Sequence, residues 1–306
     1  EAKGRPQDNP LILHIPDVSW LTRYCRNIPP AAYRLAERFW PGPLTMILQR
    51  RSNVPNVTTG GLDTVGIRCP NHPVTLAIIE AAQVPVAAPS GNLSGRPSPT
   101  CARHMEEDMD GRIDGIVDGG PCGVGVESTI IDLTCPVPRL LRPGGLPLEA
   151  LREVLGEVAV DKAVVAPLSA GERPKAPGMK YRHYAPKADM VLVEGTMENV
   201  VAYINREAKK AVEAGKKVGI ICTEESRMLY PEGLLEVIGS RNQEETVAHN
   251  LFAVLRDFDE QKVDCIFSES FSKDRLGQAI MNRLLKAAGH KIINVEEEKE
   301  NDSTGM

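Results

Sequence analysis

The sequence has few of the features that mark membrane, disulfide-bonded or metal-binding proteins. Its longest apolar runs, such as residues 263–267, are far shorter than the roughly 20 residues that a membrane-spanning helix needs. The seven cysteines are scattered with no C-x-x-C pair, and the six histidines show no H-x-x-x-H spacing. This pattern favours reduced thiols over a disulfide framework or a zinc site, and predicts no protein-held metal.

Aromatic side chains and basic charge are also scarce. Aromatic residues make up 4% of the chain, and the net charge is −5. Proteins that bind nucleic acid tightly need many basic groups for phosphates, and those that bind single strands stack bases on aromatic rings. The first residues carry charge and no apolar segment, so no signal peptide is visible. We expect a cytoplasmic protein that does not bind the membrane and makes no stable direct contact with RNA.

The length of 306 residues is enough for two domains, and charge and proline content suggest where they divide. Residues 1–160 hold 15 basic and 17 acidic residues, and 188–306 hold 15 and 22, whereas 161–187 hold six and two. The basic segment contains four prolines, which is typical of a linker. We therefore predict domains at 1–160 and 188–295, a linker at 161–187 and a charged, disordered tail at 296–306.

The first domain has the sequence pattern of a mixed α/β fold, with many prolines and glycines between short apolar segments. Its expected strands are residues 11–15, 44–48, 65–68, 84–88, 115–117, 128–133 and 139–141. Its expected helices are residues 30–39, 72–82 and 147–155.

The second domain alternates apolar strands with amphipathic helices, which predicts a parallel sheet covered on both faces, a Rossmann-like layout. Its second helix carries an apolar stripe at helical spacing from Ala248 to Phe258. No G-x-G-x-x-G follows the first strand, so a dinucleotide site is not supported. We expect strands at 190–193, 218–222, 235–238 and 263–267, helices at 198–213, 244–259 and 276–288, and a last segment at 291–294.

Two clusters in the first domain offer cations for a ligand. Lys3 and Arg5 alternate on one side of an extended segment, where they can hold a triphosphate, and Asn9 and His14 follow. Arg68 ends a strand on its small-residue side, with Thr64, and suits a carboxylate or phosphate. The alternatives are a solvated basic terminus and a surface arginine.

Two further clusters offer hydroxyl groups and backbone N–H groups. The loop from Ala87 to Thr100 follows a strand and contains Ser90, Asn92, Ser94 and Ser98, with glycines that let N–H groups face a ligand. Ser128 begins one strand and Arg142 ends the next. A plain connecting loop, and an Arg142–Asp132 ion pair, are the alternatives.

The sequence contains no signature of a covalent nucleophile. There is no G-x-S-x-G, no Cys–His pair by spacing and no pair of catalytic carboxylates. A site rich in Lys, Arg, Ser and Asn suits catalysis by positioning and charge stabilisation, as in nucleotidyl transfer, where magnesium normally shares the phosphate charge.

Taken together, the motifs are specific to one family. K-G-R-P-x-x-N-P-L, F-W-P-G-P-L-T, V-G-I-R-C-P, P-S-G-N-L-S-G, G-V-E-S-T-I-I-D and L-R-P-G-G resemble the YrdC-type threonylcarbamoyl-AMP synthases. A-P-G-M-K-Y-R-H-Y-A-P is similar to the interdomain linker of their long, two-domain form. The resemblance covers nearly the whole chain.

The resemblance implies a concave α/β synthase domain and a smaller Rossmann-like domain, joined by the Pro-rich basic linker. It implies a nucleotidyltransferase that converts L-threonine, bicarbonate and ATP, with magnesium, into threonylcarbamoyl-AMP, pyrophosphate and water. A partner transferase complex then modifies tRNA. The implied ATP-binding residues are Lys3, Arg5, Asn9, Thr64, Ser90, Ser98, Arg142 and, in the linker, His183 or Tyr184. The implied threonine-binding residues are His14, Arg68, Ala88 and Ser128, and Lys3 and Arg5 are the expected catalytic cations.

One departure from the family bears on activity. The family has a strand–turn segment with a T-x-T-x-Y-G-L-G pattern before the Lys-Gly-Arg motif, and the present sequence begins at Glu1, just before that motif. The segment contributes to threonine binding and to the central sheet. We therefore expect the chain as given to show weak or absent turnover.

Two other functions compete with this one. A carbamoyl-adenylate enzyme of hydrogenase maturation uses the same domain, but it carries zinc-finger and acylphosphatase modules that this sequence lacks. An RNA-binding or ribosome-associated module without catalysis is opposed by the acidic balance and the few aromatic residues. The second domain shows no site of its own, and we expect it and the linker to gate the nucleotide site.

Overall fold

The structure is a computed structural model, which describes residues 1–164, 166, 174–179 and 183–296. The chain forms two compact units, and the chain passes between them more than once. The first unit consists of residues 1–94, 105–120 and 127–181, and the second of 95–104, 121–126 and 182–306. No helix in the described ranges has the length and apolar character to cross a bilayer.

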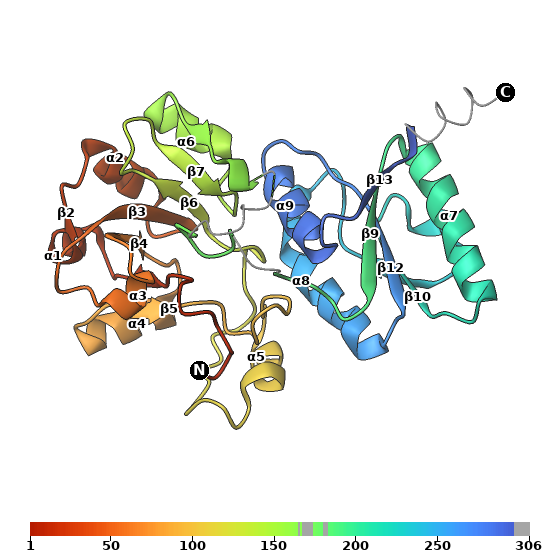
Figure 1. The fold of residues 1–306 in the computed structure, drawn as a ribbon, viewed down its shortest axis with the longest axis horizontal. Coiled ribbons are helices and arrows are strands. Elements are labelled where there is room, and N and C mark those ends of the chain that lie inside the picture. Colours follow the sequence, from red (N-terminus) through yellow and green to blue (C-terminus); the bar gives the residue numbers. More distant parts are fainter. Residues whose placement is uncertain (165, 167–173, 180–182, 297–306) are drawn as a thin grey trace. The chain divides into compact units, whose positions relative to one another are not determined.

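The first unit is built on a mixed sheet of eight strands, ordered β5-β1-β4-β3-β6-β7-β8, with β2 paired to β3 (Figure 1). The pairs β1/β4, β3/β6 and β7/β8 are parallel, and the other neighbours are antiparallel. The strands are β1 (Ile12–His14), β2 (Cys25–Arg26), β3 (Leu44–Arg50), β4 (Thr64–Arg68), β5 (Val86–Ala88), β6 (Thr129–Asp132), β7 (Arg139–Arg142) and β8 (Ala159–Val160).

Among the described residues, six α-helices and two 3₁₀ turns accompany this sheet in the sequence. They are η1 (Val18–Trp20), α1 (Leu21–Tyr24), α2 (Pro30–Phe39), α3 (Asn56–Thr59), α4 (Pro73–Ala82), α5 (Ala102–Met109), α6 (Leu148–Leu155) and η2 (Lys162–Val164). The local sequence sets the bounds of α2, because Pro30 takes the first helical position and Pro41-Gly42-Pro43 follows its end.

The two faces of the first sheet differ in what covers them. One face carries the large core, in which Leu13, Met46 and Ile67 pack against α1, α2 and α6. The other face carries Ile12, Ile47 and Ile130, which pack with Ala163, Ala176 and Met179 of the segment after the last strand. The predicted linker therefore begins by packing on the second face of the first sheet.

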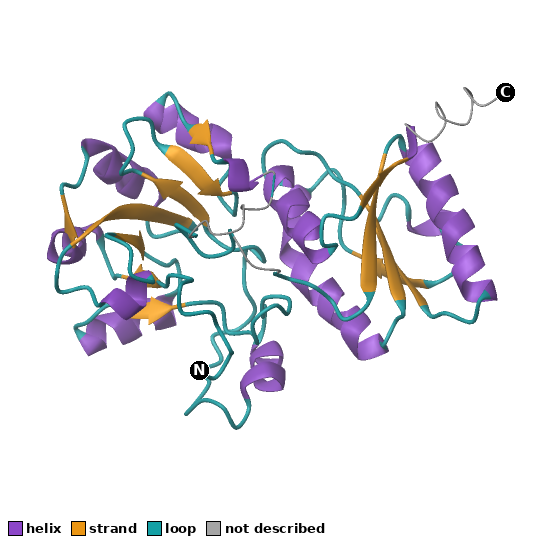
Figure 2. Ribbon diagram, in the orientation of Figure 1, coloured by secondary structure: helices purple, strands orange, loops and turns teal. Residues whose placement is uncertain are grey.

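The second unit is a parallel five-stranded sheet, ordered β11-β10-β12-β9-β13, with α7 on one face and α8 and α9 on the other (Figures 1 and 2). Its elements are β9 (Asp189–Glu194), α7 (Met197–Glu213), β10 (Val218–Cys222), η3 (Arg227–Leu229), β11 (Leu234–Val237), α8 (Glu244–Gln261), β12 (Cys265–Glu269), α9 (Gly277–Ala287) and β13 (Ile292–Asn294). The predicted Rossmann-like layout is confirmed.

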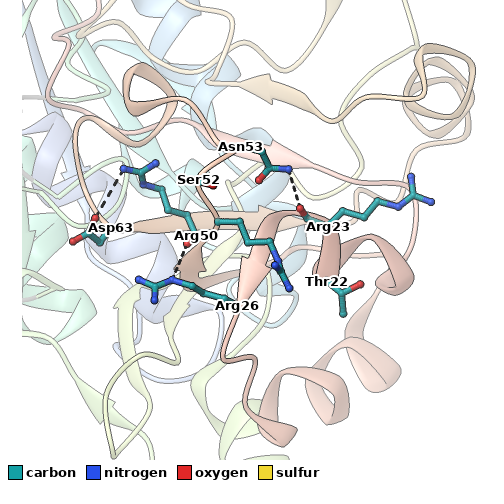
Figure 3. A pocket seen from close by; sticks show the side chains of 8 residues that line it. Thr22, Arg23, Arg26, Arg50, Ser52, Asn53 and Asp63 are labelled. Carbon is teal, nitrogen blue, oxygen red and sulfur yellow. Dashed lines mark hydrogen bonds and ion pairs between the residues drawn. The ribbon is translucent and has the colours of Figure 1, made fainter.

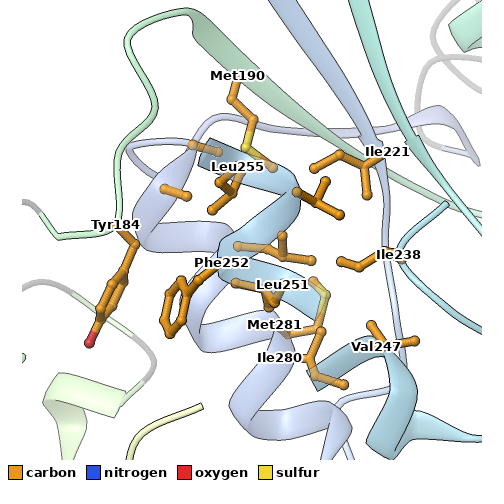
Figure 4. Close-up of a cluster of buried hydrophobic side chains, with 14 of the residues drawn as sticks. Tyr184, Met190, Ile221, Ile238, Val247, Leu251, Phe252, Leu255, Ile280 and Met281 are labelled. Atoms are coloured by element: carbon orange, nitrogen blue, oxygen red, sulfur yellow. The ribbon is translucent and has the colours of Figure 1, made fainter. Parts of the chain in front are cut away.

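The core of this unit forms where α8 and α9 meet the sheet (Figure 4). Leu251, Phe252 and Leu255 of α8 are at most 1% exposed, and they belong to the apolar stripe that predicted this helix. Gly219 of β10 lies so close to Phe258 that a Cβ atom there would come within 2.6 Å of the ring. The missing side chain lets α8 lie directly on the sheet.

One predicted element is wrong and several short ones were not foreseen. Residues 115–117 form no strand, because this short apolar run lies among glycines and no neighbouring strand pairs with it. Helix α5 was not predicted because its sequence is mostly polar, and β8 is only two residues long. The remaining predicted elements of both domains are present, with ends shifted by one or two residues.

The contact at Gly219 predicts a local packing effect. Gly219→Ala forces the Phe258 ring to move, and we expect it to lower the free energy of unfolding by about 1–3 kcal/mol. Gly123→Ala is the matched control, because nothing lies within 4 Å of the Cβ position there. Urea unfolding followed by circular dichroism measures both, and equal stability of the two variants would contradict the proposed packing.

Candidate functional site

Strand register brings residues from distant parts of the sequence into one row across the first sheet. His14 of β1 lies opposite Arg68 of β4, which lies opposite Thr45 of β3. The row continues through Ile130 of β6 to Arg142 of β7. Residues directly opposite each other on paired strands project to the same face of the sheet. Three of the predicted site residues are thus placed on one face by the backbone pairing alone.

Ser128 is the hub of a buried polar cluster at one end of this row. Its Oγ lies 2.8 Å from Thr45 Oγ1 and accepts a hydrogen bond of 3.1 Å from Arg142 Nη2. Arg142 also donates to the Ser128 carbonyl, from Nε at 3.1 Å and from Nη2 at 2.8 Å. All three side chains are at most 6% exposed. In place of the alternative Arg142–Asp132 ion pair, the guanidinium makes these bonds to Ser128.

Arg68 is oriented by the loop before β3. Its Nε donates to the Gly42 carbonyl at 3.0 Å, and the Gly42 N–H donates to the Cys69 carbonyl at 2.9 Å. These two bonds tie the end of β4 to the loop and fix the direction of the guanidinium. Gly66, two residues earlier on the same face, would place a Cβ 3.3 Å from Thr45 Cγ2, so the surface beside Arg68 is tightly packed.

His14 is held as a neutral imidazole. Its Nδ1 donates to the Val86 carbonyl at 3.3 Å, which leaves Nε2 as a hydrogen-bond acceptor. Burial, and then the positive charge of Arg68, lower the pKa of His14 from 6.5 to about 4. Between these two values the unfolded chain takes up a proton that the folded chain does not, so this group's contribution to stability is lost as the pH falls.

The amino-terminal segment lies against the loop that contains Ser90. Lys3 Nζ donates to the Ser90 carbonyl at 2.6 Å, and the Ser94 N–H donates to the Lys3 carbonyl at 2.9 Å. Burial, followed by repulsion from Arg5, lowers the pKa of Lys3 to about 8, while Asp108 acts in the opposite direction. This lysine is a cation that a negatively charged ligand would stabilise.

Arg5 and Asn9 shape the loop that leads into β1. Arg5 donates from Nε to the Asn9 carbonyl at 3.2 Å and from Nη2 to the Pro10 carbonyl at 2.7 Å. Asn9 is 5% exposed, and its Oδ1 has no hydrogen-bond partner among the described residues. A buried amide oxygen without a donor is costly, so this position is suited to a donor from outside the chain.

The other predicted residues of the first unit lie on the same strands or next to them. Thr64 begins β4 on the face of Arg68, and Ala88 of β5 lies opposite Ile12. Ser90 follows β5 and is exposed. Thr45 is the functional candidate that sequence reasoning missed. Its signal was a buried threonine in an otherwise apolar strand, within the F-W-P-G-P-L-T motif.

Ser98, His183 and Tyr184 belong to the second unit. Ser98 is 6% exposed. The Tyr184 ring is 4% exposed in the core of that unit, with its centroid 5.0 Å from that of Phe252 (Figure 4). Tyr184 therefore packs in a core here, and a nucleotide contact from it or from His183 stays a prediction. Tyr181 and Arg182 of the same motif lie outside the described residues.

A large cavity elsewhere in the first unit has a different composition. It has a volume of about 760 Å³ and is lined by Thr22, Arg23, Arg26, Arg50, Arg51, Ser52, Asn53 and Asp63 (Figure 3). Arg50 donates to the carbonyls of Leu62 and Val54, so it is used to hold its own loop. None of the predicted site residues lines this cavity.

Among the described residues, the side chains that could bind a metal ion are dispersed, and two thiols of the first unit are buried. Within the described parts of the chain, no group of three His, Cys, Asp or Glu side chains could hold a metal ion. The donor set therefore does not form a magnesium cage, although magnesium is commonly held by substrate phosphates and water instead. Burial raises the pKa of Cys25 to about 12 and that of Cys69 to about 11, so these thiols are poor nucleophiles.

Comparison with known proteins gives consistent matches over nearly the whole chain. Residues 1–144 match a family model described as "Telomere recombination", and residues 146–289 match one described as "Threonylcarbamoyl-AMP synthase, C-terminal domain". The threonylcarbamoyl-AMP synthases of Bacillus subtilis and Pyrococcus abyssi are each 49% identical over 96% of this chain, which spans 83% and 84% of their lengths. A crystal structure of P. abyssi Sua5 complexed with L-threonine matches with a TM-score of 0.90 at 48% identity, covering 96% of this chain and 84% of that one.

The proximity of Arg68 to His14 predicts a measurable coupling. We expect Arg68→Gln to raise the pKa of His14 from about 4, because one of the two causes that lower it is removed. Burial remains and keeps the value below 6.5. NMR titration of the imidazole measures the change, and Arg38→Gln on the exposed side of α2 is the control. An unchanged titration in Arg68→Gln would mean that the two groups do not interact.

Proposed function

The chain belongs to the family of two-domain threonylcarbamoyl-AMP synthases, and on that premise we propose that the row of polar side chains on the first sheet is its substrate site. The enzyme joins L-threonine, bicarbonate and ATP into threonylcarbamoyl-AMP, with release of pyrophosphate and water. This product is the activated precursor of a modified adenosine in tRNA. The observation that supports the location is the register that aligns His14, Arg68 and Thr45.

Arg68 is the proposed ligand of the threonine carboxylate. Its Nε is already bound to the Gly42 carbonyl, so the guanidinium is held in one direction and loses little entropy on binding. His14 beside it is neutral, so it adds no second charge and offers Nε2 as an acceptor. Ser128 supplies a hydroxyl whose orientation is fixed by Arg142 and Thr45. In this assignment Arg142 acts by positioning Ser128.

Lys3, Arg5 and Asn9 are the proposed contacts of the nucleotide phosphates. Lys3 has a lowered pKa and is bound to the loop at Ser90, so the ammonium and the loop are placed together. No covalent step is assigned to the protein. Its role is to align the carboxylated amine of threonine with the α-phosphorus of ATP and to balance the charge that leaves with pyrophosphate.

Magnesium is proposed to arrive with the nucleotide, because the described residues form no cage for it. The downstream transferase complex that receives the product is likewise a proposal from the family. The first part of the linker is proposed to cover the site. Ala176 and Met179 pack with Ile12 and Ile47 on the face that carries the row, and the Pro177 carbonyl accepts a 3.3 Å bond from Arg142 Nη1.

The carboxylate assignment is tested with Arg68→Ala. We expect the KM for L-threonine to rise by about 100-fold, because a charge-assisted pair is lost, while ATP affinity changes little. Threonine-dependent pyrophosphate release by each variant measures this, with Arg68→Lys expected to restore part of the loss and Arg38→Ala as the control. An unchanged KM for threonine in Arg68→Ala would remove Arg68 from the site.

The role of Lys3 predicts a pH dependence of ATP binding. Free Lys3 loses its proton near pH 8, and bound phosphates favour the charged form, so we expect ATP affinity to fall as the pH rises through 8. Lys3→Arg stays charged over this range and should bind ATP with little pH dependence. Isothermal titration with a non-hydrolysable ATP analogue compares the two. Parallel pH profiles would contradict a direct contact.

A further inference from the structure

The second sheet contains a point where neighbouring strands lead to opposite faces. β9 and β12 are parallel and hydrogen-bonded side by side, with Glu269 opposite Val193. β9 continues into α7 on one face, and β12 continues toward α9 on the other (Figures 1 and 2). In open parallel sheets such a point leaves a crevice at the carboxyl ends of the strands, and ligands bind there.

A cavity of about 330 Å³ lies at this place. Its lining includes Glu194 from the end of β9, Met197 and Val200 from α7, Arg241 from the loop before α8, and Ser270 and Phe271 after β12. The volume is at the small end of the range for ligand pockets, which suits a molecule of amino-acid size. The lining combines two charged side chains with an apolar surface of Met197, Val200 and Phe271.

Arg241 is held rigidly at the wall of this cavity. Its Nη2 is 2.5 Å from Glu269 Oε2, its Nη1 donates to the Ser270 carbonyl at 2.9 Å, and the guanidinium lies 5.0 Å from the centre of the Phe271 ring. Glu269 is fully buried and also accepts hydrogen bonds from Ser226 and from the Tyr230 hydroxyl. Two hydroxyl groups therefore share the stabilisation of this carboxylate with Arg241.

One donor of Arg241 is left without an acceptor. Its Nε is buried and has no hydrogen-bond partner among the described residues. A buried cationic N–H group without an acceptor is costly, and an oxyanion is the acceptor that such a group binds best. Arg241 lines the cavity, so an oxyanion bound there would lie next to this guanidinium.

The charges around the cavity select the overall charge of the ligand. Glu194 is paired with Lys273 at 2.5 Å, and Arg241 is paired with Glu269, so these four ionised groups sum to zero. Glu296, which lies beside Gly195 of the lining, adds a negative charge. A dianionic phosphate would add charge that nothing here offsets. Glu296 already occupies the start of α7, where it accepts hydrogen bonds from the Thr196 N–H at 2.7 Å and from Asn199 Nδ2 at 3.0 Å.

We propose that this cavity is a second ligand site of the protein, which binds a free amino acid with an apolar side chain or a zwitterion of the same size. The carboxylate binds Arg241, the ammonium group binds Glu194, and the side chain lies among Met197, Val200 and Phe271. The site is independent of the synthase chemistry, because none of its lining residues belongs to the first unit.

The proposal is tested by isothermal titration of the full chain with L-leucine, L-methionine and L-valine. We expect a dissociation constant in about the millimolar range or tighter for at least one of them. 4-Methylpentanoate, which lacks the ammonium group, and leucinamide, which lacks the carboxylate, should each bind roughly tenfold more weakly or worse.

Variants separate this cavity from the first site. Arg241→Gln should lose about tenfold or more in affinity, and Arg227→Gln, an exposed arginine of the same unit, should lose none. Met197→Trp fills the cavity and keeps every charge, so it should also abolish binding. This variant tests the proposal if Arg241→Gln does not fold. Arg68→Ala should bind the amino acid with the same affinity as the unsubstituted chain.

Three outcomes would overturn the proposal. The first is the absence of binding by all three amino acids. The second is binding that Arg68→Ala removes and that Arg241→Gln and Met197→Trp leave intact, since this would place the ligand in the first unit. The third is binding of inorganic phosphate in preference to the amino acids, since this would contradict the argument from charge balance.

Discussion

The cations of the proposed synthase site depend on backbone carbonyl groups for their orientation. Arg68 is fixed by the carbonyl of Gly42, Arg142 by that of Ser128, and Lys3 by that of Ser90. A carbonyl oxygen directs a guanidinium or ammonium group without cancelling its charge, as a carboxylate would. Burial, and then the positive charge of a neighbouring arginine, lowers the pKa values of Lys3 and His14. The proposed site therefore suits anionic substrates, at some expense to the stability of the free protein.

The two faces of the first sheet have different roles. The large core under α1, α2 and α6 fixes the strands, and through them the register that aligns His14, Arg68 and Thr45. The opposite face has a much smaller apolar cluster, so polar groups can project there beside Ile12, Ile47 and Ile130. The large core and the proposed substrate site thus lie on opposite sides of the same strands.

The second domain was predictable from local sequence patterns, because its strands are apolar runs and its helices carry apolar residues at helical spacing. The stripe on α8 is buried as its spacing indicates, and the parallel sheet follows from the alternation of elements. In the first domain all strands but β2 and β8 were also expected, but their order was not. Thr45 had no assigned role because its place beside Ser128 depends on pairing between residues 83 positions apart. The burial of Tyr184 likewise depends on contacts with Phe252, far away in the chain.

Residues 95–104 have a consequence for how the protein can be divided. They lie within the amino-terminal half of the sequence but pack in the second unit, where the Pro97 carbonyl accepts a 2.7 Å bond from the buried Arg256 and the Gly95 carbonyl accepts one of 3.0 Å from the Ala185 N–H. A single proteolytic cut in the linker would leave these bonds intact, so the two fragments would remain associated. A chimera that takes its second domain from a relative would also need that relative's residues 95–104, because these residues pack in the second unit.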